Sequence, residues 1–370
     1  MITSDHHGKF DGKGWYVTRE SGIEVHWLPV LYDNKMSNMQ RIRAFLRFAI
    51  GAALRAAAIQ ADVVFATSTP LTIAIPGVYA SKRQQIPMVF EVRDLWPEAP
   101  IAIGSLKGPM IWPALWLEKF AYRHAERIIA LAPRLKQGVI KKGISSQRIH
   151  IIPNGSELTL FTVAKSTGTQ FRQKFNWLGK RPLVVYTGTI GKVNGLIFLV
   201  NLAKAVWGLD QEICFLIVGD GIEKKGIEHA AKKSGVLNNN FFMLHPVPKE
   251  QIPSILSAAD LATSLTINNP QFTGDSANKI FDAFASKTPV AINHGGWMAK
   301  LLKETGAGLV LQPDQIERNA CTVVDFLHDK KQLEQAGLAA KQLAETQFNW
   351  NNLAKKLERI LQNTITPKQK

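Results

Sequence analysis

The fold is decided by residues 261–296, which read LATSLTINNPQFTGDSANKIFDAFASKTPVAINHGG. Two short apolar runs, 261–267 and 289–293, enclose a segment whose apolar residues recur at helical spacing, as Ile280 and Phe284 do. Uninterrupted apolar runs are typical of strands buried on both faces of a parallel sheet. The order strand, helix, strand therefore predicts a βαβ unit that ends in a glycine turn, and hence an α/β protein.

The expected helix at 275–286 carries a polar face. Asp275, Lys279 and Asp282 stand at positions i, i+4 and i+7, and Asn278 precedes Asp282 by four residues. A cation near a helix N-terminus favours phosphate, and a carboxylate accepts hydrogen bonds from a diol, so this face could hold a nucleotide sugar. The alternative is a solvated helix surface with an i,i+4 ion pair. The spacing leaves both interpretations open.

A resemblance to a known family lies in residues 272–285, FTGDSANKIFDAFA, with Pro289-Val290 after them. They look like the donor-site signature of the retaining family-four glycosyltransferases of GT-B fold, and most like the WbuB-like subgroup of bacterial polysaccharide and O-antigen enzymes. In that family two glutamates eight positions apart contact the donor sugar and the ribose. Asp282 takes the second position, whereas Gly274 falls on the first and leaves Asp275 as the neighbouring carboxylate.

The resemblance implies an α/β, GT-B architecture of two facing Rossmann-like domains with the cleft between them. It places an N-terminal acceptor-side domain at residues 1–165 and a nucleotide-sugar-binding domain at 166–347. The remaining residues, 348–370, form a C-terminal helix that crosses back to the first domain. The polar and irregular composition of residues 157–180 predicts a linker.

A second glycine turn, GTIGKVNG at 188–195, follows the apolar run 183–187. Such a turn brings backbone N–H groups close to phosphate oxygens, although βαβ proteins also use it for tight packing. By resemblance it corresponds to the pyrophosphate loop, with Thr189 and Asn194 in place of the usual arginine and lysine. The nucleotide-sugar residues implied by the resemblance are Gly188, Thr189, Lys192, Asn194, Gly274, Ser276, Asn278, Lys279 and Asp282.

In the N-terminal half, RDLWPE at 93–98 follows an expected strand, which puts charged groups at the carboxyl edge of a parallel sheet. Open α/β sheets bind ligands at that edge. The alternative is an ion pair of Arg93 with Asp94 or Glu98 that orders the loop. The subgroup has the same Arg-Asp-Leu-Trp-Pro-Glu element, and the resemblance implies that Asp94 faces the donor sugar. The implied catalytic residues are Asp94, Lys279 and Asp275.

The sequence TSTP at 67–70 also ends an expected strand at this edge and could contact the acceptor. Its alternative role is to cap the helix that begins at Leu71. The acceptor-side candidates are Arg93, Glu98, Ser68 and Thr69.

Composition indicates a globular protein with an anionic partner. The 370 residues carry a net charge of +16 and a pI near 9.8, and 46% of them are hydrophobic. The two cysteines give neither a disulfide framework nor a metal site. No Asp-x-Asp pair of the kind that holds a divalent cation was found, so we expect no metal and no other cofactor. Aromatic-interleaved RNA signatures and recognition helices are also missing, which disfavours nucleic acid.

The positive charge concentrates in helices that resemble membrane-surface elements. Residues 35–55 contain basic residues and no acidic one, with an apolar stripe on one side and Arg41, Arg43, Arg47 and Arg55 on the other. Residues 109–123 combine tryptophans with cations. The alternative for both segments is a core-packing helix with a solvated basic face. They predict a cytoplasmic protein peripherally associated with an anionic membrane, at the inner face of the plasma membrane.

The resemblance implies transfer with retention from a nucleotide sugar, UDP-linked, to a sugar acceptor carried on a lipid diphosphate. FucNAc and GlcNAc are both compatible donors for bacterial surface polysaccharide synthesis. Two rival functions stay open. One is a UDP-sugar epimerase of the same fold; the other is a non-catalytic basic module that binds membrane or nucleic acid.

The first residues resemble a second strand of this architecture more than a first one. The strand, glycine-rich loop and helix that usually open this architecture do not stand before Met1–Ser4, so we expect a segment of about 30 residues to be missing upstream. Without them the first sheet would have a vacancy between two strands, and the chain as written would be unstable or inactive.

Overall fold

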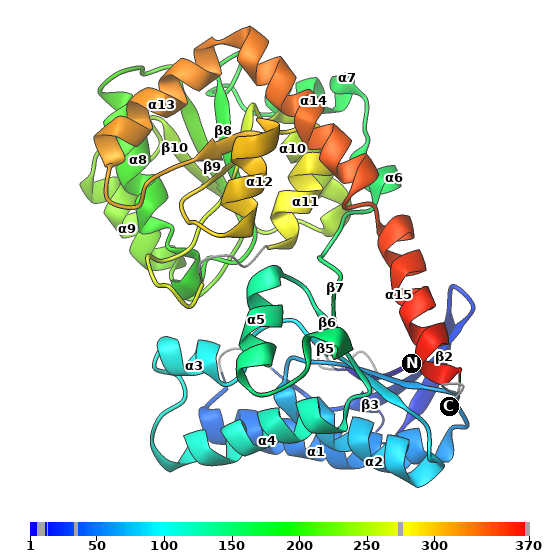
Figure 1. Ribbon diagram of the computed structural model, residues 1–370. Coiled ribbons are helices and arrows are strands. Elements are labelled where there is room, and N and C mark those ends of the chain that lie inside the picture. The colour runs from blue at the N-terminus through cyan, green and yellow to red at the C-terminus, as the bar shows by residue number, and fades with distance from the viewer. Residues whose placement is uncertain (6–11, 13, 33–35, 273–276, 367–370) are drawn as a thin grey trace. The chain divides into compact units, whose positions relative to one another are not determined.

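The computed structural model describes residues 1–370 apart from 6–11, 13, 33–35, 273–276 and 367–370. The chain divides into two compact units (Figure 1). Unit 1 comprises Met1–Ile152 together with the end of the chain from Leu357, and unit 2 comprises Pro153–Lys356.

Unit 2 is built on a parallel sheet of six strands in the order β10-β9-β8-β11-β12-β13. Chain order reverses between β8 and β11, so the carboxyl ends of these two strands flank a topological switch point. The strands are β8 Leu183–Thr187, β9 Cys214–Val218, β10 Phe241–Leu244, β11 Leu261–Ser264, β12 Val290–Ile292 and β13 Gly308–Val310. The predicted βαβ unit at 261–296 is present as β11, α11 (Asn278–Ala285) and β12.

Helices cover both faces of this sheet, as expected for strands that are apolar without interruption. Alternate residues of β8 enter different cores: Leu183 packs on one side and Val184 on the other. The other helices of unit 2 are α6 Leu158–Phe161, α7 Lys165–Gln173, α8 Ile197–Trp207, α9 Lys224–Lys233, α10 Ile252–Ala258, α12 Trp297–Thr305, α13 Ile316–His328 and α14 Lys330–Thr346, with short 3-10 turns at Lys192–Asn194 and Lys249–Gln251. Helix α15 (Trp350–Ile365) closes the chain.

The linker predicted at 157–180 is wrong. Helices α6 and α7 form there, and Phe161, Phe171 and Leu178 are buried in the core of unit 2. Helix α7 lies so close to α10 that a Cβ on Gly168 would overlap the carbonyl of Ser257. The segment is polar in overall composition, but a few widely spaced apolar residues anchor it in the core. Its composition therefore predicted a linker where two helices form.

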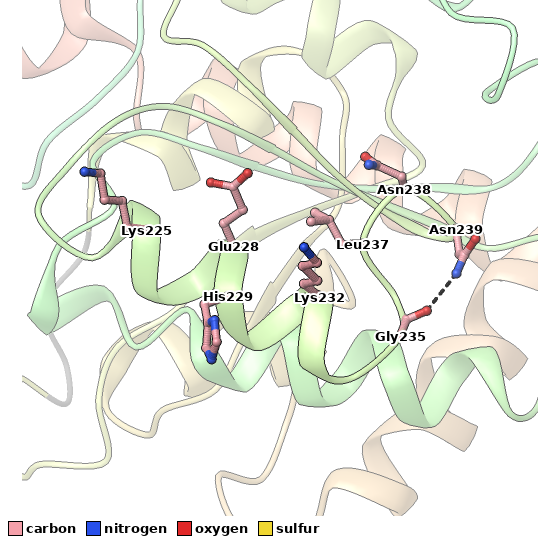
Figure 2. A pocket seen from close by; sticks show the side chains of 8 residues that line it. All are labelled: Lys225, Glu228, His229, Lys232, Gly235, Leu237, Asn238 and Asn239. Atoms are coloured by element: carbon pink, nitrogen blue, oxygen red, sulfur yellow. Dashed lines mark hydrogen bonds between the residues drawn. The ribbon is translucent and has the colours of Figure 1, made fainter.

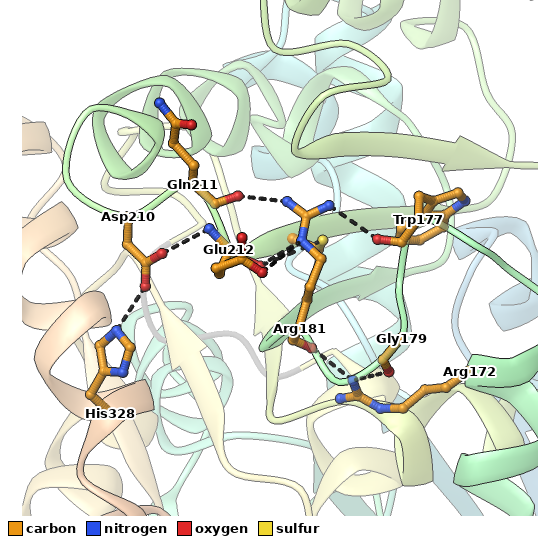
Figure 3. Close-up of polar contacts among 9 residues, drawn as sticks. Arg172, Trp177, Gly179, Arg181, Asp210, Gln211, Glu212 and His328 are labelled. Atoms are coloured by element: carbon orange, nitrogen blue, oxygen red, sulfur yellow. Dashed lines mark hydrogen bonds and ion pairs between the residues drawn. The ribbon is translucent and has the colours of Figure 1, made fainter.

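Arginines fix the amino-terminal edge of the sheet (Figure 3). Arg172 donates to Asp260 Oδ2 at 2.8 Å, and the same oxygen accepts from the backbone N–H of Leu183 at 2.8 Å. Arg181 donates to the carbonyls of Trp177 and Gln211, at 3.0 and 2.6 Å. These bonds hold the segments that enter β8 and β9, while the opposite edge of the sheet carries the loops that follow the strands.

Unit 1 contains two sheets. A parallel sheet has the order β4-β5-β6-β7, and a second sheet has the order β1-β3-β2. The strands are β1 Ile2–Asp5, β2 Tyr16–Glu20, β3 Ile23–Pro29, β4 Val64–Thr67, β5 Met88–Val92, β6 Arg127–Ala130 and β7 Ile149–Ile151. The helices are α1 Asn38–Ala58, α2 Ala74–Gln84, α3 Glu98–Ala102, α4 Ile111–His124 and α5 Pro133–Lys141, with 3-10 turns at Leu71–Ile73, Gly108–Met110 and Ser146–Arg148.

Strand β2 was not expected from the sequence. It pairs antiparallel with β3 through a tight turn in which Ser21 and Gly22 both have positive φ. Among the described residues no strand joins β1 to β4, so the two sheets stay separate. The expectation of an upstream strand stays a prediction.

Helix α1 begins after Ser37, whose hydroxyl accepts from the N–H of Gln40 in a capping box. The expected arrangement, with its arginines together on one solvated face, is wrong. Arg41 donates to the hydroxyl of Tyr32 at 3.0 Å, and Arg55 contacts Nδ1 of His26 at 2.8 Å. Two of the four arginines are thus held against the protein because neighbouring strands and loops supply acceptors that the helical pattern does not reveal.

Candidate functional site

The switch point of unit 2 is where the predicted phosphate residues meet. The turn after β8 begins at Gly188, which has a φ of +130° that favours glycine. A Cβ at this position would lie 3.1 Å from Nζ of Lys279, which reaches across from the first turn of α11. Residues separated by about 90 positions in sequence are therefore adjacent, because β8 and β11 are neighbours in the sheet.

The side chain of Lys279 is partly buried, and its ammonium group has no anionic partner among the described residues. Its Nζ lies 3.7 Å from the centroid of the Tyr186 ring. Burial lowers the pKa of Lys279 to about 7, and the electron-rich face of the ring offsets part of that cost. Lys279 is thus not fully solvated, whereas the i,i+4 ion pair of the alternative would involve Asp275, which lies outside the described residues. A desolvated cation beside a glycine turn is arranged to receive an anion.

The turn itself is braced by side chains. The hydroxyl of Tyr186 and the amide of Asn194 both donate to the carbonyl of Thr189, each at 2.6 Å. Asn194 therefore shapes the turn from within. Lys192 is exposed at the start of the 3-10 turn at 192–194.

A second glycine turn packs on the first one. The N–H of Ile190 donates to the carbonyl of Asp220 at 2.8 Å, and a Cβ on Gly219 would overlap the carbonyl oxygen of Gly188. The sequence Gly-Asp-Gly at 219–221 alone indicates only a common turn. Its contact with the turn after β8 follows from the pairing of β9 with β8, which the local sequence does not show.

Asp282, the predicted ribose contact, is held by a residue that sequence reasoning missed. Its Oδ1 accepts from Oγ of Ser156 at 3.0 Å. Burial raises the pKa of Asp282, while the bond from Ser156 and the charge of Lys249 lower it. The partners are 126 positions apart, and no local signal in the sequence marks Ser156.

Other donor candidates are placed as follows. Asn278 is exposed as the first residue of α11. Gly274, Asp275 and Ser276 lie outside the described residues, so their predicted roles stay predictions.

In unit 1 the carboxyl ends of β4 and β5 are joined by hydroxyl groups. Oγ of Ser68 accepts from the N–H of Arg93 at 3.0 Å, and Oγ1 of Thr69 donates to Oδ2 of Asp94 at 3.3 Å. The alternative role as a helix cap is wrong, since Pro70 occupies the cap position and no side chain caps the turn. Asp94 is exposed at this edge and oriented by Thr69.

A further carboxylate at this edge escaped the sequence analysis. Glu91, on β5, accepts from Oγ1 of Thr67 at 2.5 Å. Glu91 is the polar residue in the otherwise apolar run MVFEV of β5, and this signal could have identified it.

Neither predicted ion pair of Arg93 is formed: its exposed guanidinium has no carboxylate partner in the part of the chain that the structure describes. Glu98 pairs instead with Nζ of Lys142 at 3.1 Å, and Lys142 also contacts Glu118 at 3.0 Å. Glu118 is 1% exposed, and its burial raises its pKa. Glu98 thus belongs to a triad from three helical segments, a role that the sequence did not reveal.

Replacing Lys142 with methionine is expected to lower the free energy of unfolding by about 1–3 kcal/mol, because it leaves the buried Glu118 carboxylate without its cation. The loss is limited to this range because solvent screens the charge of Lys142, whose side chain is 24% exposed. Urea denaturation measures the effect. Adding Glu118→Gln should recover most of the loss, and Lys141→Met, at an exposed neighbour, should change little. Equal stability of Lys142→Met and the unchanged protein would contradict the prediction.

One cavity of about 620 Å³ lies elsewhere (Figure 2). It lies beside α9, and the turn that forms its other wall enters the amino end of β10, away from the carboxyl edge with Gly188. It is therefore distinct from the turn beside Lys279. Its lining residues are Lys225, Glu228, His229, Lys232, Gly235, Leu237, Asn238 and Asn239.

The described residues hold neither a metal-ligand cluster nor a membrane-spanning helix. No group of three or more His, Cys, Asp or Glu side chains there could hold a metal ion. Within the same residues, every helix is too short or too polar to cross a membrane.

Comparison with known families identifies both halves of the chain. Residues 4–155 match the family model described as glycosyl transferase 4-like domain, and residues 168–343 match that of glycosyl transferases group 1. Together these matches span most of the sequence. The N-terminal half therefore carries a glycosyl transferase 4-like domain, and the C-terminal half carries a domain of the glycosyl transferases group 1 family. The expected family is thereby confirmed at the level of family four and group 1.

Named relatives of this glycosyltransferase are distant. WcaI of Escherichia coli (strain K12), whose name assigns it to colanic acid biosynthesis, is 23% identical over 256 residues, covering 66% of this chain and 62% of WcaI. The glycosyltransferase WbjE of Pseudomonas aeruginosa is 22% identical over 297 residues, with 79% of this chain and 72% of WbjE covered. The chain thus spans a little under two thirds of the length of WcaI.

Solved structures confirm the GT-B fold of this glycosyltransferase. Anabaena HepE, in complex with UDP and glucose, superposes with a TM-score of 0.72 at 16% identity, covering 92% of this chain and 87% of HepE. WaaG, a glycosyltransferase involved in lipopolysaccharide biosynthesis, gives a TM-score of 0.69 at 15% identity, with 91% and 86% covered. The predicted α/β architecture of two Rossmann-like domains is therefore correct.

Proposed function

We propose that this chain is a retaining glycosyltransferase of the WbuB-like subgroup, which moves a sugar from a UDP-linked donor to a lipid-diphosphate-linked acceptor in bacterial surface polysaccharide synthesis. The observation that carries the proposal is the desolvated Lys279 beside Gly188 at the switch point of unit 2. A site of this kind suits a diphosphate. The complexes of HepE with UDP support the choice of base, and the names of WcaI and WaaG support the pathway.

On the donor side, Lys279 stabilises the charge that builds on the leaving diphosphate, so that no metal is needed. Lys192, on the exposed turn, contributes a second charge, and the backbone of Gly188 and Thr189 contacts the phosphates. Asp282, oriented by Ser156, accepts from the ribose. Attack from the face of the leaving group then gives retention.

On the acceptor side, Asp94 contacts the reacting sugar, with Thr69 holding its carboxylate. Arg93 and Ser68 line the same edge of the sheet, and Glu98 orders the loop next to it through Lys142. The domain assignment of 1–165 to the acceptor and 166–347 to the donor belongs to this proposal. So does a cytoplasmic location at the inner face of the plasma membrane. FucNAc and GlcNAc are both compatible donor sugars.

Thermal-shift profiling against UDP-, GDP- and dTDP-sugars tests the donor. UDP-sugars are expected to raise the melting temperature most, since a ligand at 100 times its Kd adds about 2.7 kcal/mol to the stability of the folded state. A larger shift with GDP-sugars would refute the choice of base. Formation of an epimer from UDP-GlcNAc without acceptor would favour an epimerase instead.

A further inference from the structure

The outer surface of α4 is unusual for a soluble helix. Trp112, Trp116, Lys119 and Arg123 are all exposed and follow one another at helical spacing, so they share one face. The side chains of Trp112 and Trp116 are 77% and 65% exposed. The helix packs through its other face, on which Glu118 and its neighbours are buried. The alternative that these tryptophans serve core packing is therefore wrong.

Helices α1 and α2 extend this surface. Helix α2 contacts both α1 and α4, and the three lie together on one side of the parallel sheet of unit 1, with α5 on the other (Figure 1). On α1 the aliphatic side chains of Leu46, Ile50 and Leu54 are exposed, as is Tyr79 on α2. We refer to the outer faces of α1, α2 and α4 as the three-helix surface. Exposed apolar side chains on three neighbouring helices are typical of an interaction site.

The charges of the three-helix surface have one sign. Exposed cations are Arg43 and Arg47 on α1, Lys82 and Arg83 on α2, and Lys119 and Arg123 on α4. The acidic residue in these helices, Glu118, is buried and paired with Lys142. The surface therefore combines aromatic rings, aliphatic groups and unopposed positive charge.

We propose that the three-helix surface docks on an anionic lipid bilayer, with Trp112 and Trp116 inserted at the level of the headgroups. This deepens the membrane association within the proposed function by naming the surface that makes it. Tryptophan has an apolar ring with a polar N–H and suits the interface, while the cations are attracted to anionic headgroups. Leu46, Ile50 and Leu54 gain nothing from a nucleic-acid phosphate backbone. A second copy of this chain would bring like charges together.

Sedimentation of the full chain with vesicles of mixed phosphatidylglycerol and phosphatidylcholine at low salt tests the proposal. The protein is expected to bind these vesicles, to bind pure phosphatidylcholine much less, and to dissociate in high salt. Trp112→Ser with Trp116→Ser should reduce partitioning roughly tenfold or more. Lys119→Gln with Arg123→Gln should reduce it by roughly fivefold for each charge.

Ile222→Ser is the matched control, because Ile222 is an apolar side chain 80% exposed in unit 2. It should leave partitioning unchanged. Equal partitioning of the double tryptophan variant and the unchanged protein would overturn the proposal, as would no binding to the anionic vesicles. It would also be overturned by tryptophan-dependent dimerisation in size-exclusion chromatography, or by RNA competing away the vesicles. The UDP-induced thermal shift of each variant is measured in parallel, so a failed docking surface is distinguished from a failed transferase assignment.

Discussion

Replacing Lys279 with methionine is expected to stabilise the ligand-free protein while removing most of its affinity for UDP. Burial lowers the pKa of Lys279 from 10.5 to about 7, which corresponds to roughly 5 kcal/mol against the charged form. At pH values between the folded and the unfolded pKa, Lys279 is protonated in the unfolded chain and neutral in the folded one. Stability of the unchanged protein therefore rises with pH across this window, and the gain from methionine is largest near pH 7 and below.

UDP affinity should change in the opposite direction. Truncating one member of a buried charged pair costs about 2–5 kcal/mol, so the Kd for UDP should rise by roughly 30-fold to 4000-fold. Calorimetry near pH 7 measures the affinity, and thermal melting from pH 6 to 10 measures the stability. Lys204→Met, at an exposed lysine of α8, is the control and should change neither. Unchanged affinity in a folded Lys279→Met protein would remove this residue from the donor site.

Asp94→Asn is expected to spare nucleotide binding and to lower turnover by roughly 10²-fold to 10³-fold, the range for loss of a positioned group that stabilises charge on the reacting molecule. The amide oxygen of asparagine can still accept from Thr69, so the loop should keep its geometry. Turnover is measured as UDP release from the donor that profiling identifies, in the presence of membrane acceptor.

Glu91→Gln is the matched control for Asp94. Glu91 is a carboxylate at the same edge that also accepts from a threonine hydroxyl. It should retain most of the activity. An unchanged rate for Asp94→Asn would place the chemistry elsewhere, and equal losses in both variants would indicate a general effect of charge at this edge.

The sheet of unit 2 was readable from sequence because both of its faces are covered. Its strands are short runs without polar interruption, as in β8 and β9, and the helices between them have clear apolar faces. Strand β2 was missed because it is half exposed and pairs in a hairpin. Two helices at 157–180 were missed because a few buried aromatic residues anchor a polar segment.

The chemistry of the site was only partly readable. The sequence predicted Lys279 as a phosphate ligand, but it did not predict the contact of this helical residue with the ring of Tyr186 on β8. Ser156 and Lys142 find their partners through tertiary contacts that leave no local pattern. The exposure of Trp112 could not be predicted, because an aromatic residue at helical spacing fits a buried face equally well.

The backbone contact between Gly219 and Gly188 couples the loop after β9 to the turn after β8, so that neither can move independently. Any side chain at 219 would collide with the carbonyl oxygen of Gly188, directly after β8. The loop after β9 therefore fixes the position of the turn beside Lys279. A substitution at Gly219 would displace that turn, although Gly219 is not among the residues proposed to contact phosphate. Redesign of the proposed donor site for other substrates therefore has to keep glycine at 219, although this residue lies behind the turn and outside the proposed contacts with the donor.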